Sequence, residues 1–278
     1  MRRQTEPDGA EGKNRMISYI DTHAHIDDSA FDGDRDALLE RLFAEGFRYI
    51  IDPAVDRAGS ERLAELSARW PGLYFCAGIH PEEVCSAEPS DYARLETLTA
   101  KDSPFRSKVA AIGETGLDYH YGAETKQEQQ ENFRLNIRLA LKNGLPLVIH
   151  DREAHQDTFD ILREEGGFET GVLFHCYSGS AEFARELQKY GCYFSLGGAV
   201  TFKNARKFEE IVGSISKDRI LPETDSPYMA PEPVRGRRND PANLKYIYPR
   251  LAMLMGMDTE AAAEQFLANS ERFFGIRI

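Results

Sequence analysis

The stretch Leu145-Pro146-Leu147-Val148-Ile149-His150 is a short apolar run that ends on a histidine, and it decides the fold. It has the length of one strand, and its hydrophobicity is continuous rather than alternating, as in a parallel sheet covered by helices. The segment before it, 125–143, has the apolar spacing of an amphipathic helix, and Gly144 with Pro146 provides a stop signal. A strand that follows a helix in this way indicates an α/β protein.

Seven further apolar runs of similar length recur along the chain, with helical patterns between them. The runs cover residues 16–20, 47–55, 73–80, 109–114, 171–176, 192–198 and 219–225. The other helical patterns cover 34–45, 57–69, 91–100, 152–165, 181–190, 204–212 and 243–255, and 258–278 is read as one extra C-terminal helix and a tail. Eight strands, each followed by a helix, predict a (β/α)8 barrel, or TIM barrel, with an open doubly wound sheet as the alternative.

Length and composition fit one globular domain, which we expect over residues 16–278 of the 278-residue chain. Residues 1–15 are polar and without an apolar pattern, so they predict a disordered N-terminal extension. The formal net charge of −12 disfavours a broad basic surface for duplex DNA, and no apolar run has the length of a membrane span. Four cysteines without CxxC spacing indicate a reduced, cytoplasmic protein.

All seven histidines lie at the end of an apolar run or in the loop just after it. They are His23, His25, His80, His120, His150, His155 and His175. In barrels of this type, the C-terminal ends of the strands and the loops beyond them form the active face. A hydrogen-bonded core histidine would explain any single position, but it does not explain the whole set. We therefore expect a functional site at this face.

Metal ligation is the chemistry that these residue types predict. In Asp21-Thr22-His23-Ala24-His25 the two imidazoles share one face of a strand, and Asp21 has the parity to orient one of them. Glu114 directly follows an apolar run, where nearby cations would offset the cost of burying it, and its two oxygens can bridge two ions. The expected ligands of a two-metal site are His23, His25, Glu114, His150, His175 and Asp225.

These residues resemble the TatD family of metal-dependent deoxyribonucleases, within the amidohydrolase-like barrels. The resemblance runs from Ile20 to about residue 275 and rests on DTHAH (21–25), GIHP (78–81), GETGLDY (113–119), IHDREA (149–154), FHCYSG (174–179), TFKNA (201–205), ETDSPY (223–228) and RGRRNDP (235–241). It implies that one ion is held by His23, His25, Glu114 and Asp225, and the other by Glu114, His150 and His175. Departures from the family pattern at Thr115, His120 and Pro222 remove none of these ligands.

The expected chemistry is hydrolysis by a water that two divalent ions activate. A bound ion lowers the pKa of its water toward about 7, and Asp225 would accept the proton as general base. His80 would contact a substrate phosphate or protonate the leaving group, or else it caps a loop against Pro81. Mixed histidine and carboxylate ligands suit Zn²⁺, Mn²⁺, Co²⁺ or Mg²⁺.

Aromatic and basic residues near the strand ends are the candidate substrate contacts. Tyr119 and Tyr228 could stack on the bases of a single strand, or they pack within the protein. Two basic clusters could bind flanking phosphates, or they form salt bridges on an acidic surface. The denser cluster is Arg235, Arg237 and Arg238 with Lys245 beyond, and the weaker one is Lys203, Arg206 and Lys207.

Three functions fit this pattern. We expect an exonuclease-type deoxyribonuclease acting on single-stranded DNA or strand ends, because a narrow barrel mouth suits a terminus better than a duplex middle. It would need no membrane and no obligate protein partner. Related barrels hydrolyse amides, esters or lactones with much the same ligands, so a metal-dependent amidohydrolase, esterase or lactonase with a small-molecule or other non-DNA substrate is the alternative. A non-catalytic barrel that keeps metal for stability is disfavoured by the intact ligand set.

Overall fold

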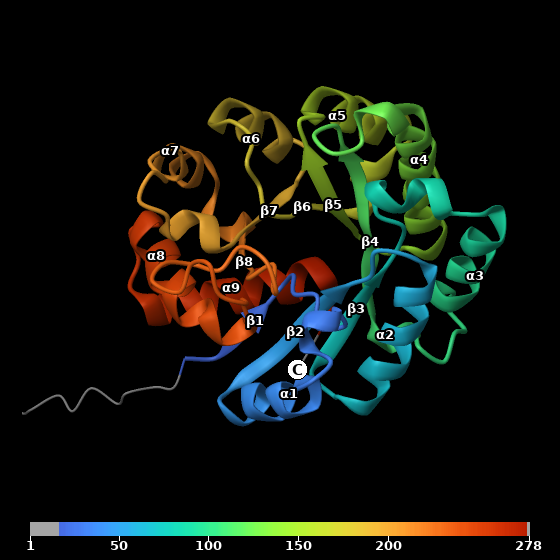
Figure 1. The fold of residues 1–278 in the computed structure, drawn as a ribbon. Coiled ribbons are helices and arrows are strands. Elements are labelled where there is room, and N and C mark those ends of the chain that lie inside the picture. Colours follow the sequence, from blue (N-terminus) through green and yellow to red (C-terminus); the bar gives the residue numbers. More distant parts are fainter. Residues whose placement is uncertain (1–16, 277–278) are drawn as a thin grey trace, which may run out of the picture.

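The structure, a computed structural model that describes residues 17–276, contains one sheet of eight parallel strands (Figure 1). The strands pair in chain order, and the sheet curves into a nearly closed barrel, which confirms the predicted fold class. The strands are β1 Tyr19–Asp21, β2 Phe47–Pro53, β3 Leu73–Ala77, β4 Val109–Asp118, β5 Leu147–Arg152, β6 Val172–Phe174, β7 Tyr193–Leu196 and β8 Ile220–Pro222.

Helices surround the barrel on its outside (Figure 1). They are α1 Arg35–Ala44, α2 Arg57–Arg69, α3 Pro89–Thr99, α4 Lys126–Asn143, α5 His155–Glu164, α6 Ala181–Gln188, α7 Lys207–Ser214, α8 Leu244–Leu254 and α9 Thr259–Phe274. The helix α4 ends where its stop signal predicts, with Gly144 in the left-handed conformation at φ 62°. The expected extra C-terminal helix is α9, which contacts α8, β8 and β1.

The first and last strands meet through a few backbone contacts, which we call the β1–β8 seam. Thr22 N–H donates to the Pro222 carbonyl at 3.2 Å, and Asp225 N–H donates to the His23 carbonyl at 2.9 Å. By contrast, β4 and β5 pair along five residue positions. The seam therefore has fewer paired positions than β4 and β5, and the predicted metal ligands His23, His25 and Asp225 lie on it.

Three C-terminal strand ends differ from those predicted by three residues or more. Strand β3 ends at Ala77 rather than at residue 80. Strand β4 continues four residues past 114, because residues 115–118 go on pairing with β5. Strand β8 ends at Pro222, three residues before the predicted end, and Asp225 then adopts a φ of 57° that no strand allows. The predicted disordered extension, 1–15, lies outside the described residues, as do residue 16 and the C-terminal pair 277–278.

One continuous apolar core fills the barrel and the space between strands and helices. Its largest fully buried side chains include Tyr49, Phe75, Phe133, Phe174 and Tyr248. Because all eight strands run in the same direction, their C-terminal ends meet at one end of this core. Among residues 17–276, none of the helices combines the length and the apolar composition that crossing a bilayer requires. All four cysteines are free.

Candidate metal centre

A buried carboxylate, Glu114, stands at the centre of the C-terminal end of the barrel. It belongs to β4, and only 2% of its surface is exposed. Side chains from four other strand ends converge on it. These are His23 and His25 just after β1, His150 in β5, His175 after β6 and Asp225 after β8. The structure thus brings together all six residues for which the sequence predicts metal ligation.

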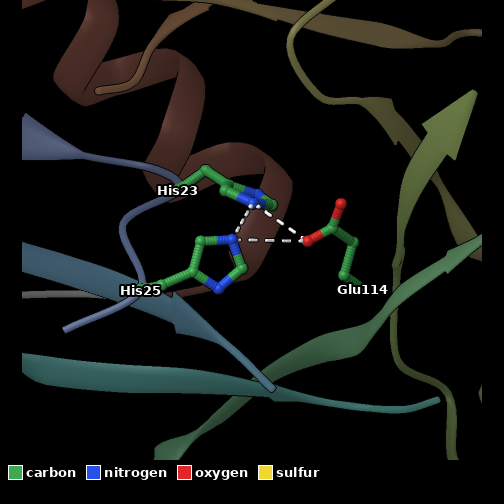
Figure 2. A group of neighbouring side chains, drawn as sticks. All are labelled: His23, His25 and Glu114. Atoms are coloured by element: carbon green, nitrogen blue, oxygen red, sulfur yellow. Dashed lines mark hydrogen bonds and ion pairs between the residues drawn. The ribbon is translucent and has the colours of Figure 1, made fainter. Parts of the chain in front are cut away.

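One oxygen of Glu114, Oε2, faces the two histidines that follow β1 (Figure 2). It lies 3.2 Å from His23 Nε2 and 3.6 Å from His25 Nε2, and these nitrogens are 3.3 Å apart. Asp225 Oδ1 lies 3.8 Å and 3.7 Å from the same two nitrogens. Around a tetrahedral ion with bonds of about 2.0–2.2 Å, ligand atoms stand about 3.3–3.6 Å apart. The atoms of His23, His25 and Glu114 therefore have a spacing close to that around one ion, and Asp225 lies slightly farther away. We call these four atoms the β1 set.

The other oxygen of Glu114, Oε1, faces a second pair of histidines. It lies 3.0 Å from His150 Nδ1 and 2.6 Å from His175 Nε2, and these nitrogens are 3.3 Å apart. We call these three atoms the β5 set. His80 Nε2 lies beside them, 3.4 Å from the same oxygen. The two oxygens of one carboxylate thus serve two separate groups of ligand atoms.

The charge of Glu114 is balanced by histidines alone among the residues that the structure describes, because no lysine or arginine lies within 4 Å of it. Burial raises the pKa of Glu114, but the charges of His175, His23 and His80 more than offset this and hold the pKa well below its usual range. A buried, ionised carboxylate between imidazole nitrogens is the donor set that divalent metals prefer. The residues present therefore fit the group that the sequence predicts.

Hydrogen bonds behind two of the rings fix which nitrogen faces the site. His25 Nδ1 lies 3.1 Å from the Pro53 carbonyl, so it carries the proton and leaves Nε2 free as a ligand. His150 Nε2 lies 2.8 Å from Asp118 Oδ2, which directs Nδ1 toward Glu114. The sequence analysis missed Asp118. It stands four residues after Glu114 on the same face of β4, and this spacing could have revealed it.

His23 and His175 lie with their rings stacked, 3.9 Å between centroids and 6° between planes. The Nδ1 atoms of both rings are buried without a hydrogen-bond partner. The nearest carboxylate is Glu223, whose Oε2 lies 3.9 Å from His175 Nδ1 and accepts a hydrogen bond from Ser195 Oγ at 2.5 Å. Burial raises the pKa of Glu223 to about 7. Glu223 is a second group behind the ligands that the sequence analysis did not single out.

Asp21 does not orient a ligand histidine, which corrects the prediction from its parity. Its carboxylate accepts from the backbone N–H of His23 at 3.2 Å, and from the N–H and hydroxyl of Thr224 at 3.0 and 2.6 Å. Closure of the barrel brings Thr224 closer to Asp21 than any imidazole ring. Asp21 therefore ties together the two segments of the β1–β8 seam that carry ligands.

The metal-free histidines differ in charge. Burial, followed by the charge of His175, holds the pKa of His23 well below its usual range. Burial also lowers the pKa of His150, but the hydrogen bonds to Asp118 and Glu114 outweigh it and raise the pKa to about 10. The pKa of His175 is raised as well, because Glu114 outweighs its burial. Without metal, protons therefore gather in the β5 set.

Five of the six predicted ligands, all except His23, line a cavity of about 1040 Å³ that opens to solvent. Its rim carries the cations and tyrosines Arg35, Arg62, Arg152, Tyr121 and Tyr228. It also carries five carboxylates, Asp27, Asp28, Asp32, Glu82 and Glu83, from the segment after β1 and the 3-10 helix η2 (Pro81–Ser86). The rim is thus acidic on the side of these two segments.

Of the two tyrosines expected at the site, one lies there. Tyr228 lines the cavity and is 54% exposed. Tyr119 points away and donates its hydroxyl proton to Asp157 Oδ2 at 2.9 Å. Tyr121 lines the cavity instead, because Asp118 Oδ1 accepts the backbone N–H of Tyr121 at 2.8 Å and curls the chain around.

The residues of the two basic clusters are divided between a salt bridge, a second pocket and the outer surface. Arg238 forms a salt bridge with both oxygens of Asp34, at 2.7 and 2.6 Å, as the salt-bridge alternative predicts. Arg235, Lys203 and Lys207 line a second pocket beside the metal cavity. The members of the two clusters that line neither pocket are Arg206, Arg237, Arg238 and Lys245. The two histidines outside the metal cluster are His120, paired with Glu153, and His155, paired with Asp151.

Comparison with known proteins agrees with this geometry. The sequence profile of the family described as "TatD related DNase" matches residues 20–275. The chain is 41% identical over 257 residues to the uncharacterized metal-dependent hydrolase YabD of Bacillus subtilis, covering 92% of this chain and 99% of that protein. It is 30% identical over 260 residues to the 3'-5' ssDNA/RNA exonuclease TatD of Cronobacter sakazakii, covering 92% of this chain and 97% of that protein.

The fold is also similar to a solved structure. The crystal structure of YJJV, a TatD homologue from Escherichia coli K12, superposes with a TM-score of 0.87 at 27% sequence identity. The match covers 94% of this chain and the whole of the other. The likeness therefore extends over the barrel and its surrounding helices rather than over the metal ligands alone.

Proposed function

This chain belongs to the TatD family of metal-dependent hydrolases, and on that premise we propose that it is a deoxyribonuclease. Its substrate would be single-stranded DNA or strand ends, cleaved at the phosphodiester bond in exonuclease fashion. The observation that carries the proposal is Glu114, whose two oxygens each face their own pair of histidines at 2.6–3.6 Å. Support for DNA comes from the Cronobacter relative, which is named for single-stranded nucleic acid.

We propose two divalent ions, one in the β1 set and one in the β5 set. Zn²⁺, Mn²⁺, Co²⁺ and Mg²⁺ all suit the mixed histidine and carboxylate ligands. When bound, such ions lower the pKa of a water toward about 7 and offset the charge of a phosphate. The chain supplies the remaining steps through Asp225 and His80.

Asp225 is the proposed general base. It lies at the cavity wall, and its Oδ1 shares the β1 set with His23 and His25. Burial raises the pKa of Asp225, against the charges of His175 and His25, and a carboxylate with a raised pKa is a better proton acceptor. Asp225 would therefore orient the attacking water and take its proton.

His80 is the proposed donor to the substrate. Its Nδ1 accepts the backbone N–H of Glu82 at 3.2 Å, so the ring of neutral His80 carries its proton on Nε2. That nitrogen faces the cavity, 3.4 Å from Glu114 Oε1. Nδ1 therefore caps the loop, and Nε2 is left for the substrate. Nε2–H can bind a phosphate oxygen or protonate the leaving alkoxide.

The exposed rings of Tyr121 and Tyr228 supply faces on which the bases of a single strand can stack. Arg152 lies over the Tyr121 ring, 4.5 Å from its centroid, and has no carboxylate within 4 Å among the described residues. An aromatic ring with an unpaired cation beside it suits an unstacked base and its phosphate.

A second candidate function rests on the acidic side of the rim. Five carboxylates beside the metal cavity repel a polyanion on that side, and they suit a small neutral or cationic substrate. A metal-dependent amidohydrolase, esterase or lactonase therefore remains the alternative.

The proposed function is tested with purified protein, stripped by chelator and reloaded with Zn²⁺, Mn²⁺, Co²⁺ or Mg²⁺ in turn. End-labelled single-stranded DNA should yield a ladder of single-nucleotide steps from one end, and chelator should abolish it. Amide, ester and lactone substrates are assayed in parallel. DNA left intact under every metal, with turnover of one of these substrates, would establish the alternative.

We also propose that the protein acts in the cytoplasm and needs no obligate protein partner. All four cysteines are free, and Cys76 and Cys192 are buried as small apolar side chains. Free thiols of this kind suit a reducing compartment.

A further inference from the structure

A second pocket of about 510 Å³ lies directly beside the metal cavity. Met229 lines both, and Cys176, which follows the ligand His175 in the chain, lines the second. A side chain at Gly198 would collide with the Met229 carbonyl, so the backbone packs closely under the boundary between the two spaces. The volume falls within the range of pockets that bind small ligands.

The wall of this pocket is largely apolar, whereas its edge is basic. Leu196, Ala199, Phe202 and Phe208 contribute apolar surface. The charged residues are Lys203, Lys207, Arg235 and one carboxylate, Glu232. None of the three cations has a carboxylate within 4 Å among the described residues. Lys207 donates to the Ser178 carbonyl at 3.4 Å and lies over the Phe208 ring, 5.3 Å from its centroid.

Unpaired cations that gather in one place are unusual on a chain with a net charge of −12. Most arginines at the metal cavity are engaged: Arg35 pairs with Asp32 at 2.7 Å, and Arg62 with Asp27 at 3.2 Å. The second pocket is therefore a local basic site. A phosphate there would meet charges that no protein carboxylate neutralises.

One cation and one ring already form a flat surface in the pocket. The Arg235 guanidinium carbon lies 4.1 Å above the centroid of the Phe202 ring. Arginine planes and aromatic rings are the two surfaces on which proteins stack unpaired bases. An apolar pocket with such a stack and with lysines at its edge has the chemistry of a nucleotide site.

The charges around the metal cavity also favour one path for a bound DNA strand. On one side the strand would meet the five rim carboxylates, and on the other side, past Met229, it would meet Lys203, Lys207 and Arg235. A polyanion is repelled by the first side and attracted by the second. The segments that carry these cations lie around α7 and before α8 (Figure 1).

We infer that this second pocket binds the nucleotide adjoining the scissile phosphate of a single-stranded DNA substrate. The base stacks at Phe202 and Arg235, and the phosphate contacts Lys203 and Lys207. The inference rests on the proposed function, since it assigns a subsite to the same substrate. It joins into one site residues from two basic clusters that are separate in the sequence.

The test measures binding of a phosphorothioate oligothymidylate to the metal-loaded protein at several salt concentrations. Lys203→Ala and Lys207→Ala should each reduce the slope of log Kd against log salt by about 0.7, because each removes one phosphate contact to a single strand. Phe202→Leu should weaken binding by roughly tenfold without changing the slope, because it removes a stacking face. Arg235→Lys separates charge from stacking, since it should keep the slope and lose affinity.

Two matched controls remove the same charges elsewhere. Arg48→Ala and Lys101→Ala replace exposed residues that line neither pocket and have no carboxylate within 4 Å in the described part of the chain. Both should bind the oligonucleotide as the wild type does. Metal content and the unfolding temperature of every variant verify that the fold and the metal centre are intact.

Cleavage kinetics distinguish this inference from the proposed function. With a cleavable oligonucleotide, the pocket variants should raise KM more than they lower kcat. If the wild type cleaves DNA and the pocket variants bind and cleave it like the two controls, the pocket lies off the path of the substrate and the inference is overturned. If the wild type neither binds nor cleaves DNA under any metal, the proposed function falls first, and the inference falls with it.

Discussion

The β1 set and the β5 set share one carboxylate, but the groups behind their histidines differ. In the β1 set the backing is neutral, since His25 Nδ1 meets the carbonyl of Pro53 and His23 Nδ1 meets no partner. In the β5 set the backing is a carboxylate, because Asp118 lies 2.8 Å from His150 Nε2. Histidine ligands of one site are thus backed by neutral groups in one set and by a carboxylate in the other.

This difference has consequences for metal binding. A carboxylate behind an imidazole makes the ring a more basic ligand and fixes its orientation. In the absence of metal, the same carboxylate keeps the ring protonated, so an ion must displace that proton. We expect the two sets to bind their ions with different dependence on pH, and the β5 set to depend on pH more strongly.

Replacing Glu114, the carboxylate that both sets share, should disrupt both sets and have the largest effect. Glu114→Gln keeps the shape of the side chain but loses the charge that both sets use. We expect kcat/KM on DNA to fall by about a thousandfold or more, and both ions to be lost or weakly held. Activity assays and metal analysis measure this, with the exposed Glu124→Gln as the matched control. Full metal content in Glu114→Gln would show that the carboxylate does not join the two sets.

Asp225→Asn changes a predicted ligand of the β1 set and should have the next largest effect. The amide cannot accept the proton that a carboxylate takes, and general bases contribute about 10²- to 10⁴-fold to rates. We expect kcat to fall by about this factor, with metal retained in the β5 set. Steady-state kinetics with metal analysis test the prediction. A wild-type rate in this variant would remove Asp225 from the mechanism.

Asp118→Asn affects the β5 set alone. Loss of a carboxylate behind a ligand histidine typically weakens metal binding by about 10- to 100-fold. We expect this loss for one ion of the two, with the affinity of the β1 set unchanged. Glu223→Gln should have a smaller effect, because its Oε2 lies 3.9 Å from the His175 ring. Titration with a competing chelator measures both variants, and equal losses from the two sets would refute the comparison.

The pH dependence of the metal-free protein should show the smallest effect. The pKa of His150 is raised from 6.5 to about 10, since its bonds to Asp118 and Glu114 outweigh burial. The protonated ring therefore stabilises the fold fully below pH 6.5, and this contribution is lost as pH rises toward 10. We expect the unfolding temperature of chelator-treated protein to fall by roughly 2–4 °C more in the wild type than in Asp118→Asn over this range. Identical curves would show that the ion pair does not form.

The sequence predicted which polar residues lie at the barrel mouth because a single physical rule places them. Buried parallel strands are continuous apolar runs, so the first polar residue after each run lies at the barrel mouth. His150 and His175 end two such runs, and both lie in the β5 set. The family resemblance then divides the six ligands between two ions, and this division stays a prediction, because His23 also lies close to His175 and Asp225 in the structure.

Features that depend on turns or on barrel closure could not be predicted in the same way. Tyr119 and Tyr121 are two residues apart, and the hydrogen bond that Asp118 accepts from the backbone of Tyr121 turns Tyr121 toward the cavity. Asp21 has the parity of a ligand partner, yet the seam brings Thr224 to it instead. Such contacts join residues that are far apart in the sequence, so no local pattern reveals them.

The β1–β8 seam has a consequence for how the enzyme is made. His23 and His25 leave the ribosome early, whereas Asp225 follows some two hundred residues later, just after the last strand. Until β8 emerges, a growing chain has neither a closed wall nor the complete β1 set. A metal-dependent hydrolase whose site is completed in this order would be inactive during most of its own synthesis.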